Sequence, residues 1–118
     1  MDKHYRQGDI LLIKISVLPP LTFKEKKDKV ILEGEVAGHA HKLEGGAKVL
    51  EVAEEIANAF GLGTFGPRPN SQVIGYAVVD APAELTHDDH PTITIPPGEY
   101  QIRRQKEYDE KEARFVED

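Results

Sequence analysis

The sequence predicts a mainly β protein, a small sandwich or barrel with one inserted short helix. Short runs of branched and aromatic residues recur along the chain, and glycine- and proline-rich turns separate them at short intervals. Only one stretch has the apolar spacing of a helix. A length of 118 residues suits a single domain with its own core, so we expect residues 1–118 to form one β-rich domain.

The first strands are predicted on both sides of a charged connection. Ile10–Ile15 is a branched run that follows the turn residues Gly8-Asp9, and Pro19-Pro20 ends it. Residues 21–29 are charged and lack periodicity, which predicts an exposed loop. The β pattern resumes at Val30–Glu33.

The middle of the chain allows two interpretations. Apolar residues from Val49 to Phe60 follow helical spacing, and Gly61 stands where a helix C-cap is expected. Alternatively, residues 48–52 alternate as a strand, and the helix begins near Ala53. In either case, we expect residues 53–72 to be a helix-plus-loop insertion, because glycines and prolines follow the helix.

The second half of the chain predicts four further strands. Residues 73–79 form the first, and a turn at 80–82 separates it from a strand at 83–86. Residues 92–95 alternate, and a half-buried strand follows at 100–103. The chain ends in a charged tail at 109–118.

Composition excludes several classes of protein. There is no cysteine, which excludes disulfides, zinc–thiolate sites and iron–sulfur clusters. The net charge of −6 argues against a binder of duplex nucleic acid, which needs a basic surface. The longest apolar run, Ile10–Ile13, is far shorter than the roughly 20 residues that cross a bilayer. The start lacks the layout of a secretory signal, so we expect a cytoplasmic protein with no membrane partner.

Two close histidine pairs, His39/His41 and His87/His90, are the candidate catalytic and metal-binding residues. Histidines one residue apart on an extended segment point to the same side, and a tight turn can bring the second pair together. Four imidazoles suffice for a divalent metal such as zinc, nickel, iron or manganese. Neighbouring carboxylates would serve as second-shell or substitute ligands: Glu44, Asp88 and Asp89.

Other roles for these histidines remain open. Without a metal, a histidine can act as general base and acid near neutral pH. Turns also recruit aspartate and histidine for ordinary backbone hydrogen bonds, so both pairs could be structural. A pH-sensitive or partner-binding role is a third possibility.

Two resemblances bear on these residues. The blocks Tyr5–Asp9, Gly34–His41 and His87–Tyr108 resemble a group of small bacterial and phage-type proteins of unassigned function, which implies a shared fold. The His-x-His near a glycine bend, followed by Pro96-Pro97-Gly98, loosely resembles the cupins, which are metal-holding double-sheet barrels. In that comparison Glu44 comes early for the family's glutamate, and Gln101 stands where its later histidine is expected.

The expected function is therefore a small histidine-rich metal or acid/base site, such as that of a metal-dependent hydrolase acting on a phosphodiester or a small polar molecule. A metal-bound water would then be the nucleophile, because no protein nucleophile stands out. The alternative is a non-catalytic interaction or self-assembly module, associated with phages or mobile elements. Such a module would bind a protein partner or form a homo-oligomer.

Overall fold

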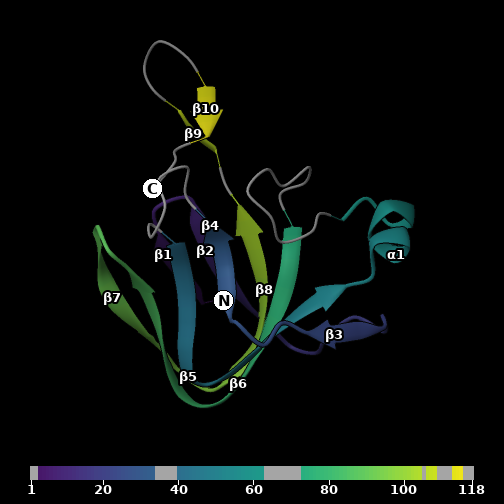
Figure 1. Cartoon of the computed structure of the whole chain (residues 1–118), viewed down its shortest axis with the longest axis horizontal. Helices are drawn as coiled ribbons and strands as arrows, with labels where there is room; N and C mark the ends of the chain where they lie inside the picture. The colour runs from purple at the N-terminus through teal and green to yellow at the C-terminus, as the bar shows by residue number, and fades with distance from the viewer. Residues whose placement is uncertain (1–2, 34–39, 63–72, 105, 109–112, 116–118) are drawn as a thin grey trace.

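The computed structural model describes residues 3–33, 40–62, 73–104, 106–108 and 113–115. Within them, one antiparallel eight-stranded sheet and one short helix form a sandwich- or barrel-like fold whose sheet does not close (Figure 1). The predicted fold class is therefore confirmed. None of the described helices is long and apolar enough to span a membrane.

The main path of the sheet runs in the order β1-β2-β8-β6-β5-β3. Two further strands flank this path, since β4 pairs with β5 and β7 pairs with β6. The described bounds are β1 His4–Gln7, β2 Ile10–Ile15, β3 Phe23–Glu25, β4 Val30–Glu33, β5 Ala40–Val52, β6 Val73–His87, β7 His90–Ile95 and β8 Gly98–Arg104. A separate pair, β9 Lys106–Tyr108 and β10 Ala113–Phe115, lies beyond β8, so a strand falls within the predicted charged tail.

The two longest strands, β5 and β6, bend together and give the sheet its curvature (Figure 1). Their register shifts between Gly45 and Ala47, and Gly45 has a φ of 95°. A Cβ at Gly46 would lie 2.6 Å from the Ala81 Cβ and 2.7 Å from its carbonyl oxygen, so only glycine fits this approach. Strand β6 consequently continues through residues 80–82, where the sequence predicted a turn between two strands.

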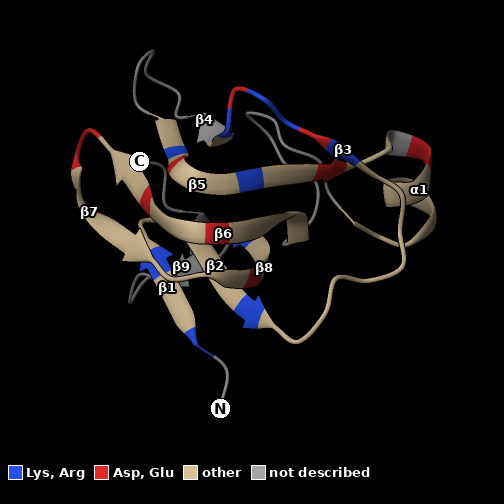
Figure 2. Ribbon diagram, turned by 90° about the horizontal axis from the view of Figure 1, so that it is seen from below, with Lys and Arg blue, Asp and Glu red and all other residues tan. Residues whose placement is uncertain are grey.

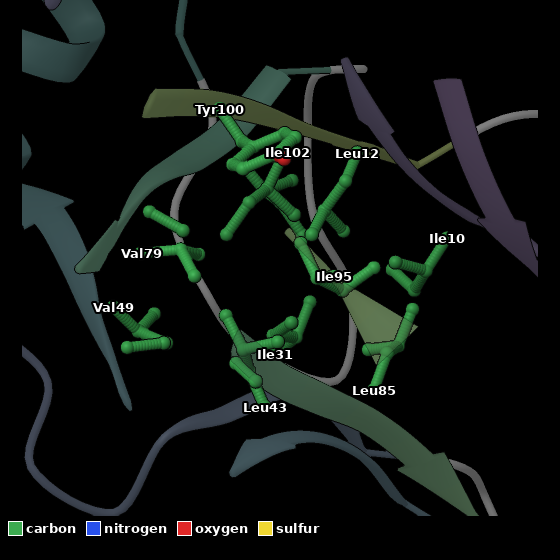
Figure 3. Close-up of a cluster of buried hydrophobic side chains, with 14 residues drawn as sticks. Ile10, Leu12, Ile31, Leu43, Val49, Val79, Leu85, Ile95, Tyr100 and Ile102 are labelled. Atoms are coloured by element: carbon green, nitrogen blue, oxygen red, sulfur yellow. The ribbon is translucent and has the colours of Figure 1, made fainter. Parts of the chain in front are cut away.

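Each half of β6 has a different neighbour. Its first half, Val73–Val79, pairs with β8, and its second half, Ala83–His87, pairs with β7. Branched and aromatic side chains from the inner face of the curved sheet point toward one another and form the core (Figure 3). The labelled core residues are Ile10, Leu12, Ile31, Leu43, Val49, Val79, Leu85, Ile95, Tyr100 and Ile102.

The structure decides between the two interpretations of the middle of the chain. Strand β5 extends to Val52, and the helix α1 spans Glu54–Ala59. The strand-then-helix interpretation is therefore confirmed, and the longer helix from Val49 is wrong because Val49 and Leu50 pair with Ala77 and Tyr76. Gly61 follows the helix with a φ of 69°, as predicted for a C-cap glycine.

The charged connection at residues 21–29 also differs from its prediction. Phe23–Glu25 forms the edge strand β3, which pairs with Leu50–Val52. Phe23 packs edge-to-face on Tyr76 with ring centroids 5.5 Å apart, in a second apolar cluster that includes Ala57 of the helix. Three residue pairs and one aromatic contact therefore hold β3 as a strand, although its local sequence has no strand periodicity.

Candidate functional site

Buried polar side chains gather at one end of the apolar core. Among the residues whose side chains the structure describes, five polar or charged ones are buried: Gln7, Asp9, His41, His87 and Arg104. With the half-buried His90 they form what we call the polar end cluster. Burying a charged or amide group costs free energy unless other groups form hydrogen bonds or ion pairs with it. The contacts among these side chains therefore explain how they can be buried together.

The β1–β2 hairpin supplies the first two members. Gly8 has a φ of 59° and forms the turn with Asp9. Alternation along the hairpin directs Gln7 inward while Arg6 is exposed. Asp9 is fully buried, and its Oδ2 accepts a hydrogen bond from the Arg104 Nε at 3.0 Å. A paired cation of this kind is what a buried carboxylate requires.

The Gln7 amide determines which His41 nitrogen carries a proton. Gln7 Nε2 donates to the backbone carbonyls of Leu85 at 2.9 Å and Pro91 at 3.0 Å. These two acceptors orient the amide, so the Gln7 Oε1 is the atom that lies 2.9 Å from His41 Nδ1. Because Oε1 only accepts, His41 Nδ1 is the donor and bears a hydrogen.

The other His41 nitrogen faces the buried carboxylate. His41 Nε2 lies 3.5 Å from Asp9 Oδ1. This spacing exceeds the usual N–H···O range of 2.7–3.2 Å, so Asp9 acts on the ring mainly through its charge.

His87 has the opposite tautomer. The backbone N–H of Asp89 donates to His87 Nδ1 at 3.0 Å, so this nitrogen keeps its lone pair. The neutral His87 ring therefore carries its hydrogen on Nε2. His41 and His87 thus present chemically different Nε2 atoms, an acceptor on the neutral His41 and a donor on His87.

The three described rings of the cluster are in contact. The ring centroids lie 4.4 Å apart for His41 and His87, 4.8 Å for His87 and His90, and 5.8 Å for His41 and His90. His41 is 1% exposed and His87 8%. His90 is the most accessible of the three.

The structure thus brings together three of the four candidate histidines. His39 lies outside the described residues, and its predicted role stays a prediction. Among the residues that the structure describes, no group of three or more histidines or carboxylates is arranged to hold a metal ion. The His87 Nδ1 accepts a hydrogen bond from the Asp89 backbone N–H, and the predicted metal role of His87 stays a prediction.

The predicted carboxylate helpers take other positions. Glu44 is exposed on β5, where it lies 3.8 Å from the Lys42 Nζ and opposite Glu84, so its predicted place beside the histidines is wrong. Asp88 and Asp89 are exposed at the tip of the β6–β7 hairpin (Figure 2). Asp89 contacts His87 through its backbone N–H, which is a contact that any residue there could make.

Three members of the cluster were missed from sequence. Asp9 was interpreted as an ordinary turn residue, and Gln7 and Arg104 were not singled out. A signal was nevertheless present for Gln7 and Arg104, because each shares the inward face of a strand with an apolar neighbour. Arg104, for example, alternates with Tyr100 and Ile102 on β8, and a charged residue in such a series indicates a buried partner.

Comparison with known proteins gives one match. A domain of unknown function, DUF8820, matches residues 6–105. No curated protein and no solved structure matches the chain, and the resemblance to cupins stays a prediction. The matched range contains every described member of the polar end cluster, and it covers most of the chain. The chain therefore belongs to the DUF8820 family.

Proposed function

We propose that the polar end cluster is a metal-free histidine acid/base site acting on a small polar molecule. The observation that carries the proposal is the pair of opposed tautomers on His41 and His87, set by a buried hydrogen bond at His41 and a part-buried one at His87. A site with one imidazole that accepts a proton and a second that donates a hydrogen bond has the groups that proton transfer with polarisation of the substrate requires.

His41 is the residue that gives and takes the proton. Gln7 keeps a hydrogen on Nδ1 in both protonation states, so the ring needs no rotation between them. Nε2 is then the working atom, and the Asp9 carboxylate at 3.5 Å stabilises the imidazolium that forms when it gains a proton. Arg104 holds Asp9 in place.

His87 is the hydrogen-bond donor of the site. A neutral imidazole N–H polarises a carbonyl or phosphoryl oxygen without transferring its proton. The hydrogen bond from Asp89 N–H keeps His87 in this form, because a second ring proton would have to displace it. Cleavage of an ester or phosphodiester bond is the reaction class that fits these two roles.

The test begins with the ring nitrogens. Two-dimensional NMR of ¹⁵N-labelled protein reports the protonation of each imidazole nitrogen as pH is varied. We expect His41 to keep a proton on Nδ1 and the neutral His87 to carry its proton on Nε2. A His41 ring protonated on Nε2 alone would contradict the proposal.

Activity is then measured with a chelator present. Model nitrophenyl esters and phosphodiesters are offered to the wild type, to His41→Gln and to a matched control, His4→Gln, which changes an exposed histidine. We expect turnover to fall by about 10²–10⁴-fold in His41→Gln and to stay near the wild-type rate in the control. Equal rates in all three proteins would assign any turnover to surface imidazoles. Binding of a protein partner or of another copy of the chain stays a prediction.

A further inference from the structure

The acid/base site is closed in this structure. Asp9 is fully buried and His41 is 1% exposed, so no substrate atom reaches the His41 Nε2 unless a covering segment moves. We infer that the tip of the β6–β7 hairpin, His87–Pro91, is the gate of this site and that Gln7 is its latch. This inference rests on the proposed acid/base function, and it adds how access to the site is controlled.

The pairing of β6 and β7 shows where the gate would hinge. The ladder is regular from Ala83↔Ile95 to Leu85↔Ile93, and its register then shifts before His87↔His90. Irregularities of this kind bend a strand and interrupt its ladder. On the fixed side, Thr86 is tied to β5, because its Oγ1 donates to the Lys42 carbonyl at 3.3 Å. The segment that can move therefore begins after Thr86.

Gln7 bridges the two sides of this hinge. Its Nε2 donates both to the Leu85 carbonyl on the fixed side and to the Pro91 carbonyl on the gate. Strand β1 contacts β7, but the backbone of β1 is paired with β2 and that of β7 with β6. The Gln7 amide therefore links two neighbouring strands that are not paired with each other in the described sheet. Opening would break the bond to Pro91 and keep the bond to Leu85.

This division keeps His41 ready while the gate opens. The Gln7 Oε1 accepts from His41 Nδ1, and both His41 and Leu85 belong to strands on the fixed side. The Gln7 amide thus stays oriented by Leu85 after Pro91 has left it. Asp88 and Asp89 at the tip are both exposed (Figure 2).

The experiment compares Gln7→Glu with Gln101→Glu. Glutamate at position 7 retains an oxygen for His41 Nδ1 but has no N–H for Pro91 or Leu85. Gln101→Glu makes the same chemical change on β8, away from the hinge. Modification of the His41 ring by diethyl pyrocarbonate, followed by peptide mass spectrometry, reports opening, because this ring is 1% exposed in the closed structure. We expect its modification rate to rise at least about tenfold in Gln7→Glu, beyond any rise in amide exchange at Leu43 and Ile102, and to change less than about twofold in the control.

A second measurement uses the unmodified protein, in case Gln7→Glu does not fold. NMR relaxation dispersion of the amides at Asp88, Asp89 and His90 should reveal a shared opening rate that Leu43 and Ile102 lack. Tip amides without a shared opening rate, or a His41 ring whose modification rate is unaffected by Gln7→Glu, would overturn the gate. The ring-nitrogen spectra of His41 are independent of these results, so failure of the gate is distinguished from failure of the acid/base site.

Discussion

Arg104 donates a hydrogen bond from Nε to Asp9 Oδ2 across 3.0 Å, joining the end of β8 to the β1–β2 turn. Both side chains are buried, at 7% and 0% exposure. The same Asp9 carboxylate lies beside His41. The Arg104–Asp9 ion pair therefore contributes to the stability of the fold and also holds the negative charge that faces the candidate site. Its contribution can be measured by removing each partner in turn.

Replacing Arg104 with methionine should destabilise the protein strongly. The Asp9 carboxylate would lose its buried cation, and breaking such a pair costs about 3–5 kcal/mol. In an Asp9→Asn background the same replacement should cost much less, because no buried carboxylate remains. Urea unfolding of the two single variants and the double variant measures this coupling. Additive losses would contradict it, and Arg6→Met on the exposed face is the matched control.

Gly46→Ala should destabilise the bend that β5 shares with β6. The added Cβ would meet the Ala81 Cβ at 2.6 Å and the Ala81 carbonyl oxygen at 2.7 Å. Overpacking of this kind costs about 1–3 kcal/mol. Thermal unfolding of Gly46→Ala, with and without Ala81→Gly, separates the two contacts. We expect Ala81→Gly to restore little, because the backbone oxygen remains, and full recovery would assign the clash to the side chain alone.

Tyr100 should make the fold sensitive to alkaline pH. Burial raises the pKa of the Tyr100 hydroxyl above its usual value, and the nearby Tyr5 raises it further. A group whose folded pKa is raised stabilises the fold fully below its unfolded pKa of about 10, and that contribution is lost as pH rises above it. We therefore expect the free energy of unfolding to fall between about pH 9 and 11.

Tyr100→Phe tests this pH dependence. The variant loses the hydrogen bond from Tyr100 Oη to the Pro96 carbonyl at 2.7 Å, which should cost about 1 kcal/mol at neutral pH. It should also lose less stability than the wild type on going to alkaline pH. Denaturant unfolding at several pH values gives both quantities, and parallel pH profiles would show that Tyr100 does not cause the effect.

Leu43→Ala should identify the packed centre of the molecule. Leu43 is fully buried in the main apolar cluster, so its truncation leaves a cavity and costs about 2–5 kcal/mol. Val17→Ala is the matched control, because Val17 is 72% exposed and its truncation should change stability by less than about 0.5 kcal/mol. Chemical unfolding measures both, and a loss at Leu43 as small as that at Val17 would contradict the assigned core.

Local patterns in the sequence were sufficient for the fold class and for most strands. Ile10–Ile15 and Val30–Glu33 are strands as predicted, because their branched side chains suit a half-buried pleated surface. Proline and glycine likewise marked the turn before β8. The edge strand β3 and the unbroken β6 were not predictable in this way, since a contact with Tyr76 and the close approach of Gly46 to Ala81 decide them.

The sequence by itself determined which histidines are candidates for chemistry, because the identity and spacing of the two pairs are local properties. Only the tertiary structure decided that His41 and His87 meet, and that Gln7, Asp9 and Arg104 surround them. Asp9 and Arg104 are 95 positions apart, and no periodicity within a strand encodes a contact over that separation. The register of β1, β2 and β8 and the shared bend of β5 and β6 create that contact, together with the buried surroundings that make the tautomers of the two histidines definite.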